Sequence, residues 1–386
     1  MRPLRKRAGG QFLPGCSRAI QAERTDGEID EAFADSSRTY NGGDQDTARP
    51  NSMSVEPKDM RHDFAEISVN GSQRVVPAAI IDGKTVVVTS SYIKIAVVKD
   101  EEYLEGDSIK SADAFIETLK RSGLKADILC FAQKPVESRP KYSYYTEWDN
   151  AAIIPIKSAS EWWEERLPQE TRRNVRRAAK LGITVKSVEF NDELVRGIES
   201  IYNETPVRQG KGFWHYGKDF DTVKKENATY LDRSEFIGAY FENELVGFVK
   251  LVYVDRTASI MQILSKNAHH DKRPTNALIA KAVEISAQRG MAYLMYCKYV
   301  YGKNDKSDLT EFKRRNGFEQ LLYPRYYVPL GLKGRIILWL KLHQGFSRLV
   351  PKRLWPVLVN ARAKFYEIAR RRKPVPRELK ILRVRV

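Results

Sequence analysis

The chain has 386 residues and a formal net charge of +17, from 66 Lys and Arg against 49 Asp and Glu. This length accommodates two ordinary domains, or one duplicated core with tails. The surplus of positive charge lies at one end, because residues 331–386 contain 16 Lys and Arg and two Glu. A basic tail of this kind favours an anionic partner, either membrane lipid or RNA.

The cysteines and the apolar runs exclude several protein classes. Cys16, Cys130 and Cys297 are far apart and lack metal-ligand spacing, so we expect neither a disulfide framework nor a metal site. No apolar run approaches the length of a membrane span, and no apolar signal core follows the N-terminal arginines. These features predict a cytoplasmic protein.

Residues 1–60 are rich in Arg, Gly, Ser and Asp and have no hydrophobic period. We expect them to form a disordered N-terminal extension. Met53 stands just before the first periodic pattern, and we expect the functional chain to begin near it.

Residues 61–157 predict a small α/β unit. Residues 107–123 have the Asp/Ser start, the apolar spacing of three and four, and the Gly stop of a helix. β-branched runs bounded by turn residues predict strands. These runs are 75–81, 85–98, 126–132 and 151–156. A basic linking segment, 158–182, then predicts one long helix over 159–180.

Residues 183–330 predict the element order β-α-α-β-β-β-α-β-α-β-β. The helix that starts at Pro274 has proline in its first turn and Gly290 as its stop. The last two elements are predicted as separate short strands, over 318–323 and 325–330. Residues 331–386 predict a basic, amphipathic, helical C-terminal tail.

This order, together with the FKRRNGF run at 312–318, resembles the GNAT-type acyltransferase superfamily, and especially its Fem-like branch. The resemblance covers residues 71–330 and rests mainly on the part from Ile183 onward. It implies an α/β (α+β) fold of tandem GNAT-like domains, with mixed central sheets flanked by helices and a degenerate first half. It also implies an N-acyltransferase that transfers an acyl group from acyl-CoA, such as acetyl-CoA, to an amine.

The resemblance implies a donor site where a strand meets the helix at Pro274, since a helix N-terminus offers unpaired N–H groups to a pyrophosphate. The implied donor-binding residues are Leu264, Ser265, Lys266, Lys272, Arg273, Thr275 and Asn276. Thr275 stands where CoA users have the central Gly of their loop, whereas Pro274, Asn276 and Leu278 fit a Fem-like Pro-x-Asn-x-Leu pattern. The alternative is an ordinary helix start, capped by Pro and Asn.

Lys313 stands where many acyl-CoA users have a Tyr that protonates the leaving thiolate. A Lys can donate a proton there if its pKa falls, but we expect Lys313 to face solvent. Gly317 is expected to supply a turn conformation that other residues avoid. The sequence contains no recognisable Ser-His-Asp or Cys-His constellation.

The stretch YNETPVRQGKGFWHYGKDF, residues 202–220, keeps no helical or strand period. On the resemblance it covers the acceptor end of the groove. Arg208 and Gln209 are then predicted to bind the acceptor together with the aromatic faces of Trp214 and Tyr216. The predicted proton acceptor is Glu204 or His215. The alternative is a loop packed onto the core by its own aromatic residues, with an Arg–Glu pair.

Three functions follow from these patterns. The leading one is acylation of an amine of a bacterial envelope precursor, an amino sugar or a peptide, with the tail on an anionic membrane surface at the inner face. The second uses aminoacyl-tRNA as donor, so that the cations bind RNA. The third is a GNAT-fold binding module without catalysis.

Overall fold

The computed structural model describes residues 63–69, 72–89, 92–135, 137, 139–208, 210–301 and 307–344. The predicted N-terminal extension and most of the predicted tail lie outside the described residues.

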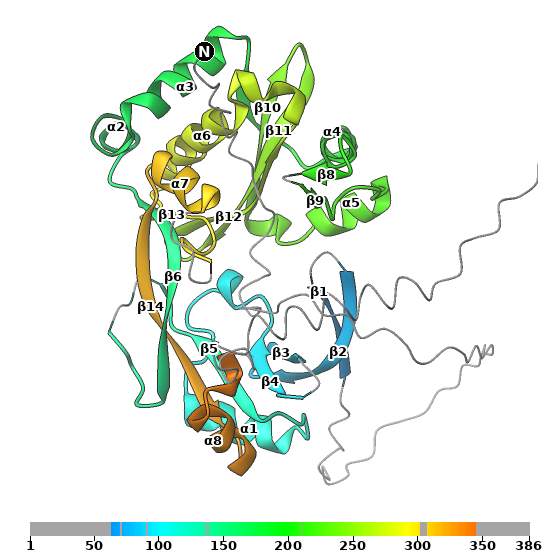
Figure 1. Ribbon diagram of the computed structural model, residues 1–386, viewed down its shortest axis with the longest axis vertical. Coiled ribbons are helices and arrows are strands. Elements are labelled where there is room, and N and C mark those ends of the chain that lie inside the picture. The colour runs from blue at the N-terminus through cyan, green and yellow to red at the C-terminus, as the bar shows by residue number, and fades with distance from the viewer. Residues whose placement is uncertain are drawn as a thin grey trace, which may run out of the picture.

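The described chain forms one mixed sheet of twelve strands flanked by helices (Figure 1). The strand order is β1-β2-β3-β4-β5-β14-β6-β13-β12-β11-β10-β7, and β8 and β9 form a separate pair. The strands are β1 (Asp63–Val69), β2 (Ser72–Ile81), β3 (Lys84–Thr89), β4 (Ile95–Val98), β5 (Ile128–Ala132), β6 (Tyr145–Pro155), β7 (Thr184–Val188), β8 (Val207–Arg208), β9 (Lys211–Gly212), β10 (Ser234–Phe241), β11 (Glu244–Val254), β12 (Thr257–Ser265), β13 (Tyr293–Met295) and β14 (Glu319–Pro329). The predicted mixed α/β architecture is confirmed.

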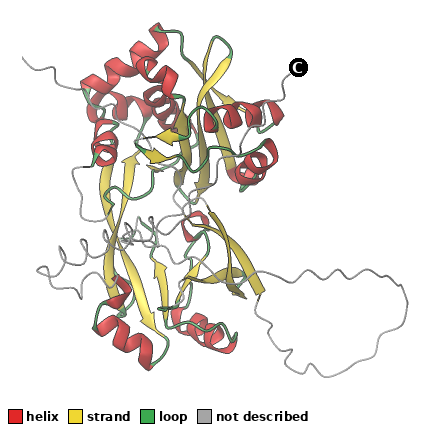
Figure 2. Cartoon of the chain, turned by 45° about the vertical axis from the view of Figure 1, so that its right-hand side comes forward, coloured by secondary structure: helices red, strands yellow, loops and turns green. Residues whose placement is uncertain are grey.

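The helices cover both faces of the sheet (Figure 2). They are α1 (Ala112–Arg121), α2 (Ala159–Glu161), α3 (Gln169–Lys180), α4 (Asp192–Tyr202), α5 (Phe220–Asn227), α6 (Pro274–Gln288), α7 (Asp308–Arg315) and α8 (Leu332–Trp339). Short helical turns are η2 (Glu101–Tyr103), η3 (Trp162–Arg166), η4 (Leu231–Arg233), η5 (Asn267–Lys272) and η6 (Leu342–Gln344).

The prediction of one helix over 159–180 was wrong. The chain instead forms α2 and the π-helical turn η3, and then bends at Leu167 and Pro168 before α3 begins. Proline lacks the N–H that would continue the helical ladder, and it disfavours helical geometry in the residue before it. The bend lets Trp162 pack into the core, where it is 2% exposed.

The sheet has a first half built on β1–β5 and a second half built on β7 and β10–β13, and the two halves exchange a strand. Each half contains a parallel pair joined through a helix: β4 and β5 through α1, and β12 and β13 through α6. However, β6, which follows β5 in the sequence, pairs with β13, and β14 pairs with β5. β6 and β14 also pair with each other, so the sheet is continuous from one half to the other (Figure 1).

β14 is a single strand, where two had been predicted. Pro324 lies inside it, opposite Trp148 of β6. The Pro324 carbonyl accepts a hydrogen bond from Gln133 N at 2.9 Å, so the backbone of Pro324 faces β5 rather than β6. The missing N–H therefore lies on the β5 side, just beyond the first ladder pair at Arg325, and removes no hydrogen bond to β6.

The second half contains two cores, one on each side of its sheet. α6 covers one face, where Leu278, Ala282 and Val283 pack on buried strand residues. α4 covers the other face, where Val195 and Ile198 pack in a separate cluster. Because both faces are covered, β11 reads as a nearly continuous apolar run.

Gly317 ends α7 with a φ of +79°, as expected, and an added Cβ would lie 2.8 Å from Nε1 of buried Trp162. Gly290, which follows α6, has a φ of +68° and open space around its Cα. Gly290→Ala should therefore lower the free energy of unfolding by about 1 kcal/mol through backbone strain alone. Gly317→Ala should cost about 1–3 kcal/mol more, measured by urea denaturation. Equal losses in the two variants would contradict the tight contact with Trp162.

Candidate active site

Strands β12 and β13 part shortly after they meet. They pair only from Thr257 to Ser259 on β12, opposite Tyr293–Met295. The chain after β13 then bonds to β6 alone, since Tyr296 N donates to Ala152 O and Ala152 N donates to Cys297 O, both at 2.8 Å. Within the described ranges, the continuation of β12 has no strand partner on that side, which leaves a gap in the sheet.

Two backbone features coincide with the gap. The β11–β12 register shifts between Lys250 and Leu251, whose partners are Gln262 and Ile260, so β12 carries a bulge where it leaves β13. Bulges bend a strand and increase its twist. On the other side Cys297 has a φ of 47°, which is unusual for a residue with a side chain. Such strain concentrates at functional sites.

A cavity of about 600 Å³ lies between the two halves, next to this gap. Ser259 and Ile260 of β12, and Met295 and Cys297 beyond the gap, line one wall. The opposite walls come from η2, β5 and β14. The Ser259 side chain is 3% exposed, and its hydroxyl has no hydrogen-bond partner among the described residues. A cavity of this volume fits a small ligand or one end of a larger one.

A buried ion cluster connects the halves beneath the cavity. Arg325 of β14 donates to Glu101 Oε1 at 2.7 Å and to Asp149 Oδ2 at 2.8 Å. Asp149 also pairs with Lys298 at 2.9 Å. Although burial opposes charging, the nearby carboxylates raise the pKa of Arg325 well above its ordinary value. Removing one partner of such a buried pair costs about 3–5 kcal/mol, because the other charge is left uncompensated.

Glu102 lines the same cavity and has no ion-pair partner in the described part of the chain. Burial, and then the charges of Asp100 and Glu101, raise the pKa of the Glu102 carboxyl to about 8. Its surface remains partly accessible because it faces the cavity. A carboxylate of this basicity is a better proton acceptor at neutral pH than an ordinary Glu.

Lys313 is fully buried, so the expectation that it faces solvent was wrong. Its ammonium donates to Lys298 O and lies 4.6 Å and 5.0 Å from the ring centroids of Tyr296 and Tyr301. Burial lowers the pKa of Lys313 to about 7. Because Lys298 and Tyr301 both line the cavity, Lys313 lies directly behind its wall.

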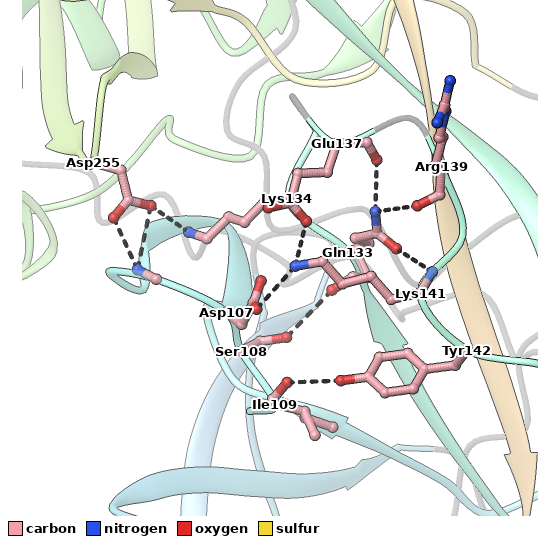
Figure 3. A network of polar contacts seen from close by, with 12 residues as sticks. Asp107, Ser108, Ile109, Gln133, Lys134, Glu137, Arg139, Lys141, Tyr142 and Asp255 are labelled. Carbon is pink, nitrogen blue, oxygen red and sulfur yellow. Dashed lines mark hydrogen bonds and ion pairs between the residues drawn. The ribbon is translucent and has the colours of Figure 1, made fainter. Parts of the chain in front are cut away.

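The side of the cavity is closed by a contact between the β11–β12 turn and the segment after η2 (Figure 3). Asp255 accepts a hydrogen bond from Gly106 N at 2.9 Å and pairs with Lys134 at 3.2 Å. Asp255 N in turn donates to Glu105 Oε2 at 2.7 Å. Charges and backbone groups from both halves therefore hold this wall in place.

Arg208, predicted to bind the acceptor, lies against the far end of β12 and is 9% exposed. Its guanidinium donates to Ser265 O, Ile201 O and Glu204 Oε2, each at 3.1 Å. Since Lys266 N bonds to β11, the Ser265 carbonyl points to the side that β13 leaves open. Arg208 therefore fills the end of the gap near Ser265, and the gap stays open at the cavity end.

The other predicted acceptor residues lie in the same loop. His215 is 2% exposed and stacks on Trp214, with ring centroids 3.6 Å apart. Burial, and then the charges of Lys218 and Arg208, lower the pKa of His215 to about 2, which makes it a very weak base. Tyr216 is 48% exposed. Gln209 lies outside the described residues. These contacts match the alternative of a self-packed loop with an Arg–Glu pair, and roles in acceptor binding stay predictions.

The predicted donor residues surround the start of α6. The Glu204 carboxylate already accepts hydrogen bonds from Asn267 N at 2.7 Å and Ala268 N at 2.8 Å in this loop. Thr275 Oγ1 lies 3.0 Å from Ser265 Oγ, and Asn276 Nδ2 donates to Asn316 Oδ1 at 2.9 Å. An incoming phosphate would therefore meet a carboxylate at these amides.

The remaining predicted donor residues also have protein partners or specific backbone roles. Lys266 pairs with Glu244 and donates to Ser200 Oγ at 2.8 Å. Lys272 lies 4.7 Å from the ring centroid of Phe241. Arg273 precedes α6 with a φ of 59°, and Leu264 is buried in the core on the α4 side.

Sequence reasoning missed Glu101, Glu102, Asp149 and Arg325. The signal was the acidic run DEEYLEGD at 100–107, between a strand and a helix, which ordinarily indicates a solvated loop. The partners of this run lie on β6 and β14, far away in the sequence.

No protein-family model and no curated protein matches the sequence. Similar solved structures include a protein named FemX, which is 12% identical, with a TM-score of 0.48 over 73% of this chain and 91% of that chain. The C-terminal domain of a putative lysylphosphatidylglycerol synthetase from Agrobacterium fabrum is 14% identical, with a TM-score of 0.45 over 68% and 86% of the two chains. A tandem GNAT protein from the clavulanic acid biosynthesis pathway is 10% identical, with a TM-score of 0.36 over 67% and 80%.

The two halves of the described chain repeat one arrangement. Each half places a helix between two parallel strands, and in the second half these strands part, as the resemblance stated from the sequence implied.

The burial of Lys313 predicts a pH dependence of stability. Its pKa is about 7 in the folded chain and about 10.4 when unfolded. Between these values the unfolded state binds more protons, so stability rises with pH. In Lys313→Met, the rise between pH 7 and pH 9 should be smaller by up to about 1.4 kcal/mol per pH unit. Urea denaturation at several pH values measures it, with exposed Lys120→Met as control. An unchanged slope in Lys313→Met would contradict a depressed pKa.

Proposed function

We propose that this protein is an N-acyltransferase whose acceptor amine binds in the cavity where β12 and β13 part. The observation that carries the proposal is a fully buried Lys313 behind the cavity wall, at the end of the gap that stays open. Enzymes that transfer an acyl group directly need a neutral amine, a reachable carbonyl and a proton donor for the leaving group. Glu102 can produce the neutral amine, and Lys313 can supply the proton for the leaving group.

The proposed chemistry runs in one displacement. Glu102 takes a proton from the ammonium form of the acceptor, since its raised pKa suits proton transfer from an amine. The amine nitrogen then attacks the acyl carbon and a C–N bond forms, the nitrogen releases its second proton to water, and the bond from that carbon to the leaving oxygen or sulfur breaks. Lys313 gives a proton to the leaving atom, and the Tyr296 and Tyr301 ring faces hold its ammonium in position.

In the described part of the chain, the cavity offers the acceptor one acidic group without an ion pair. Five carboxyl groups line it, from Glu101, Glu102, Asp107, Glu137 and Asp255, against four cationic side chains. Glu101 and Asp255 are paired with Arg325 and Lys134, whereas Glu102 is mostly protonated at neutral pH because of its raised pKa. The amine of an amino sugar or of a peptide, as in a cell-envelope precursor, could exchange a proton with Glu102 and has a suitable size.

Two donors are candidates. Acyl-CoA follows from the resemblance to GNAT enzymes. An aminoacyl ester, as carried by tRNA, is the second candidate, and the Glu204 carboxylate, held by the amides of Asn267 and Ala268 in the turn before α6, would repel a pyrophosphate placed beside it. An ester also needs the proton donor more, because an alkoxide is a much stronger base than a thiolate.

Replacing Lys313 tests the chemistry. Lys313→Met should lower kcat by about 10²–10⁴-fold, since a general acid contributes that much, while the KM for the acceptor changes little. Acyl transfer would be followed by mass spectrometry with a panel of acyl-CoA and aminoacyl-tRNA donors and amine acceptors. Lys120→Met is the matched control and should behave as wild type. A Lys313→Met enzyme with wild-type kcat would overturn the assigned role.

The two donors differ in how they bind. If the donor is an aminoacyl ester on tRNA, tRNA should raise the melting temperature at 50 mM salt and much less at 200 mM, since phosphate contacts depend steeply on salt. Acetyl-CoA should then leave the melting temperature unchanged. Stabilisation by acetyl-CoA alone would establish the CoA reading instead. If neither donor binds or reacts, the transferase proposal fails and the inactive binding module remains.

A further inference from the structure

Helix α8 is fixed tightly to the sheet of the first half. Its inner side chains Ile337 and Leu338 are 4% and 6% exposed and pack on Ile93 and Ile128. An added Cβ at Gly334 would lie 2.1 Å from the backbone carbonyl oxygen of Asp127, so α8 approaches the segment just before β5 as closely as a glycine allows. The position of α8 is therefore set by packing.

Polar contacts fix both ends of this helix. At its start, Lys333 pairs with Asp127 at 2.9 Å and donates to Tyr92 O at 3.0 Å. Just after its end, His343 is buried against Tyr145 and Tyr327 and lies 2.8 Å from a Glu147 carboxylate oxygen. These contacts prevent the helix from rotating about its axis, so the orientation of its exposed face is fixed as well.

The outer side of α8 is apolar and exposed. Leu332, Ile336, Trp339 and Leu340 are 74%, 47%, 80% and 41% exposed. At about 100° per residue, these four positions form one stripe opposite the packed face. A rigidly held Trp with four-fifths of its surface accessible is costly in water unless another surface covers it.

Cations border the stripe. Lys333 and Arg335 project on its two sides at the helical spacing, and Lys341 follows the helix. Arg335 and Lys341 have no ion pair within the described ranges. The sequence beyond this point, residues 345–386, adds 13 Lys and Arg against two Glu. The stripe is thus followed directly in the sequence by a strongly cationic segment.

We infer that the outer face of α8 docks on an anionic lipid bilayer. Trp and aliphatic side chains between cations are the pattern of a segment that lies in the membrane interface, where the apolar groups enter the acyl boundary and the cations meet anionic headgroups. None of the helices in the described ranges has the length and apolarity to cross a bilayer, so the attachment is peripheral. The charge of the following segment favours a bilayer over a second copy of this chain, since two such cationic surfaces would repel.

Vesicle flotation with the full chain tests this inference independently of any transferase activity. Vesicles of phosphatidylcholine with one quarter phosphatidylglycerol are compared with pure phosphatidylcholine at two salt concentrations. The double variant Ile336→Ser with Trp339→Ser should partition at least about tenfold more weakly onto the anionic vesicles. The matched control is Ile80→Ser, which removes an exposed aliphatic residue (67% exposed) from β2 and should partition as wild type.

A second measurement identifies the contacting residue. Brominated lipids should quench part of the tryptophan fluorescence of the wild type, and Trp339→Phe should keep binding while losing most of that quenching. Wild-type partitioning by the double variant would overturn the inference, because the rest of the basic segment would then bind alone. Absence of wild-type flotation would also overturn it, as would size-exclusion chromatography showing self-association that the double variant abolishes, or binding to RNA without binding to vesicles.

Discussion

The site depends on how one short strand shares its hydrogen bonds. The chain from Tyr293 to Cys297 stays bonded to β6 along its length, but it stays bonded to β12 for only three residue pairs. β6 can take that position because the two halves exchange strands, so that β6 and β14 lie between them. Once β13 follows β6, the bulged β12 must diverge, and the divergence opens the sheet beside the cavity.

The surroundings of that opening favour reactivity over stability. Arg325, Asp149 and Glu101 form ion pairs with one another. Glu102, which is partly accessible, and Lys313, which is fully buried, have no ion-pair partner among the described residues, and their pKa values move toward neutrality from opposite directions. Groups shifted in this way are unfavourable for folding and useful for proton transfer. Elsewhere in the molecule, α8 presents an exposed apolar stripe whose orientation is fixed by packing. This stripe immediately precedes the strongly basic C-terminal segment of the sequence.

Local sequence patterns predicted most of the elements in the second half and the mixed fold, because both faces of that sheet carry the periodicity of buried strands and an amphipathic helix. Sequence could not predict that β14 continues through Pro324, since this depends on which neighbour the Pro324 backbone faces. Nor could it predict a buried Lys313, because FKRRNGF has the composition of an exposed helix end. The cavity draws residues from both halves, and their proximity follows only from the strand exchange.

The central claim is that acyl transfer takes place in the cavity at the parted strands and not beneath the loop at 208–216. One comparison of turnover tests it directly: Ser259→Trp, which fills the cavity from a side chain that already faces it, against Tyr216→Ala in the loop. The account predicts that Ser259→Trp retains the fold by circular dichroism but loses turnover, while Tyr216→Ala keeps it. Full turnover in Ser259→Trp together with its loss in Tyr216→Ala would contradict the account.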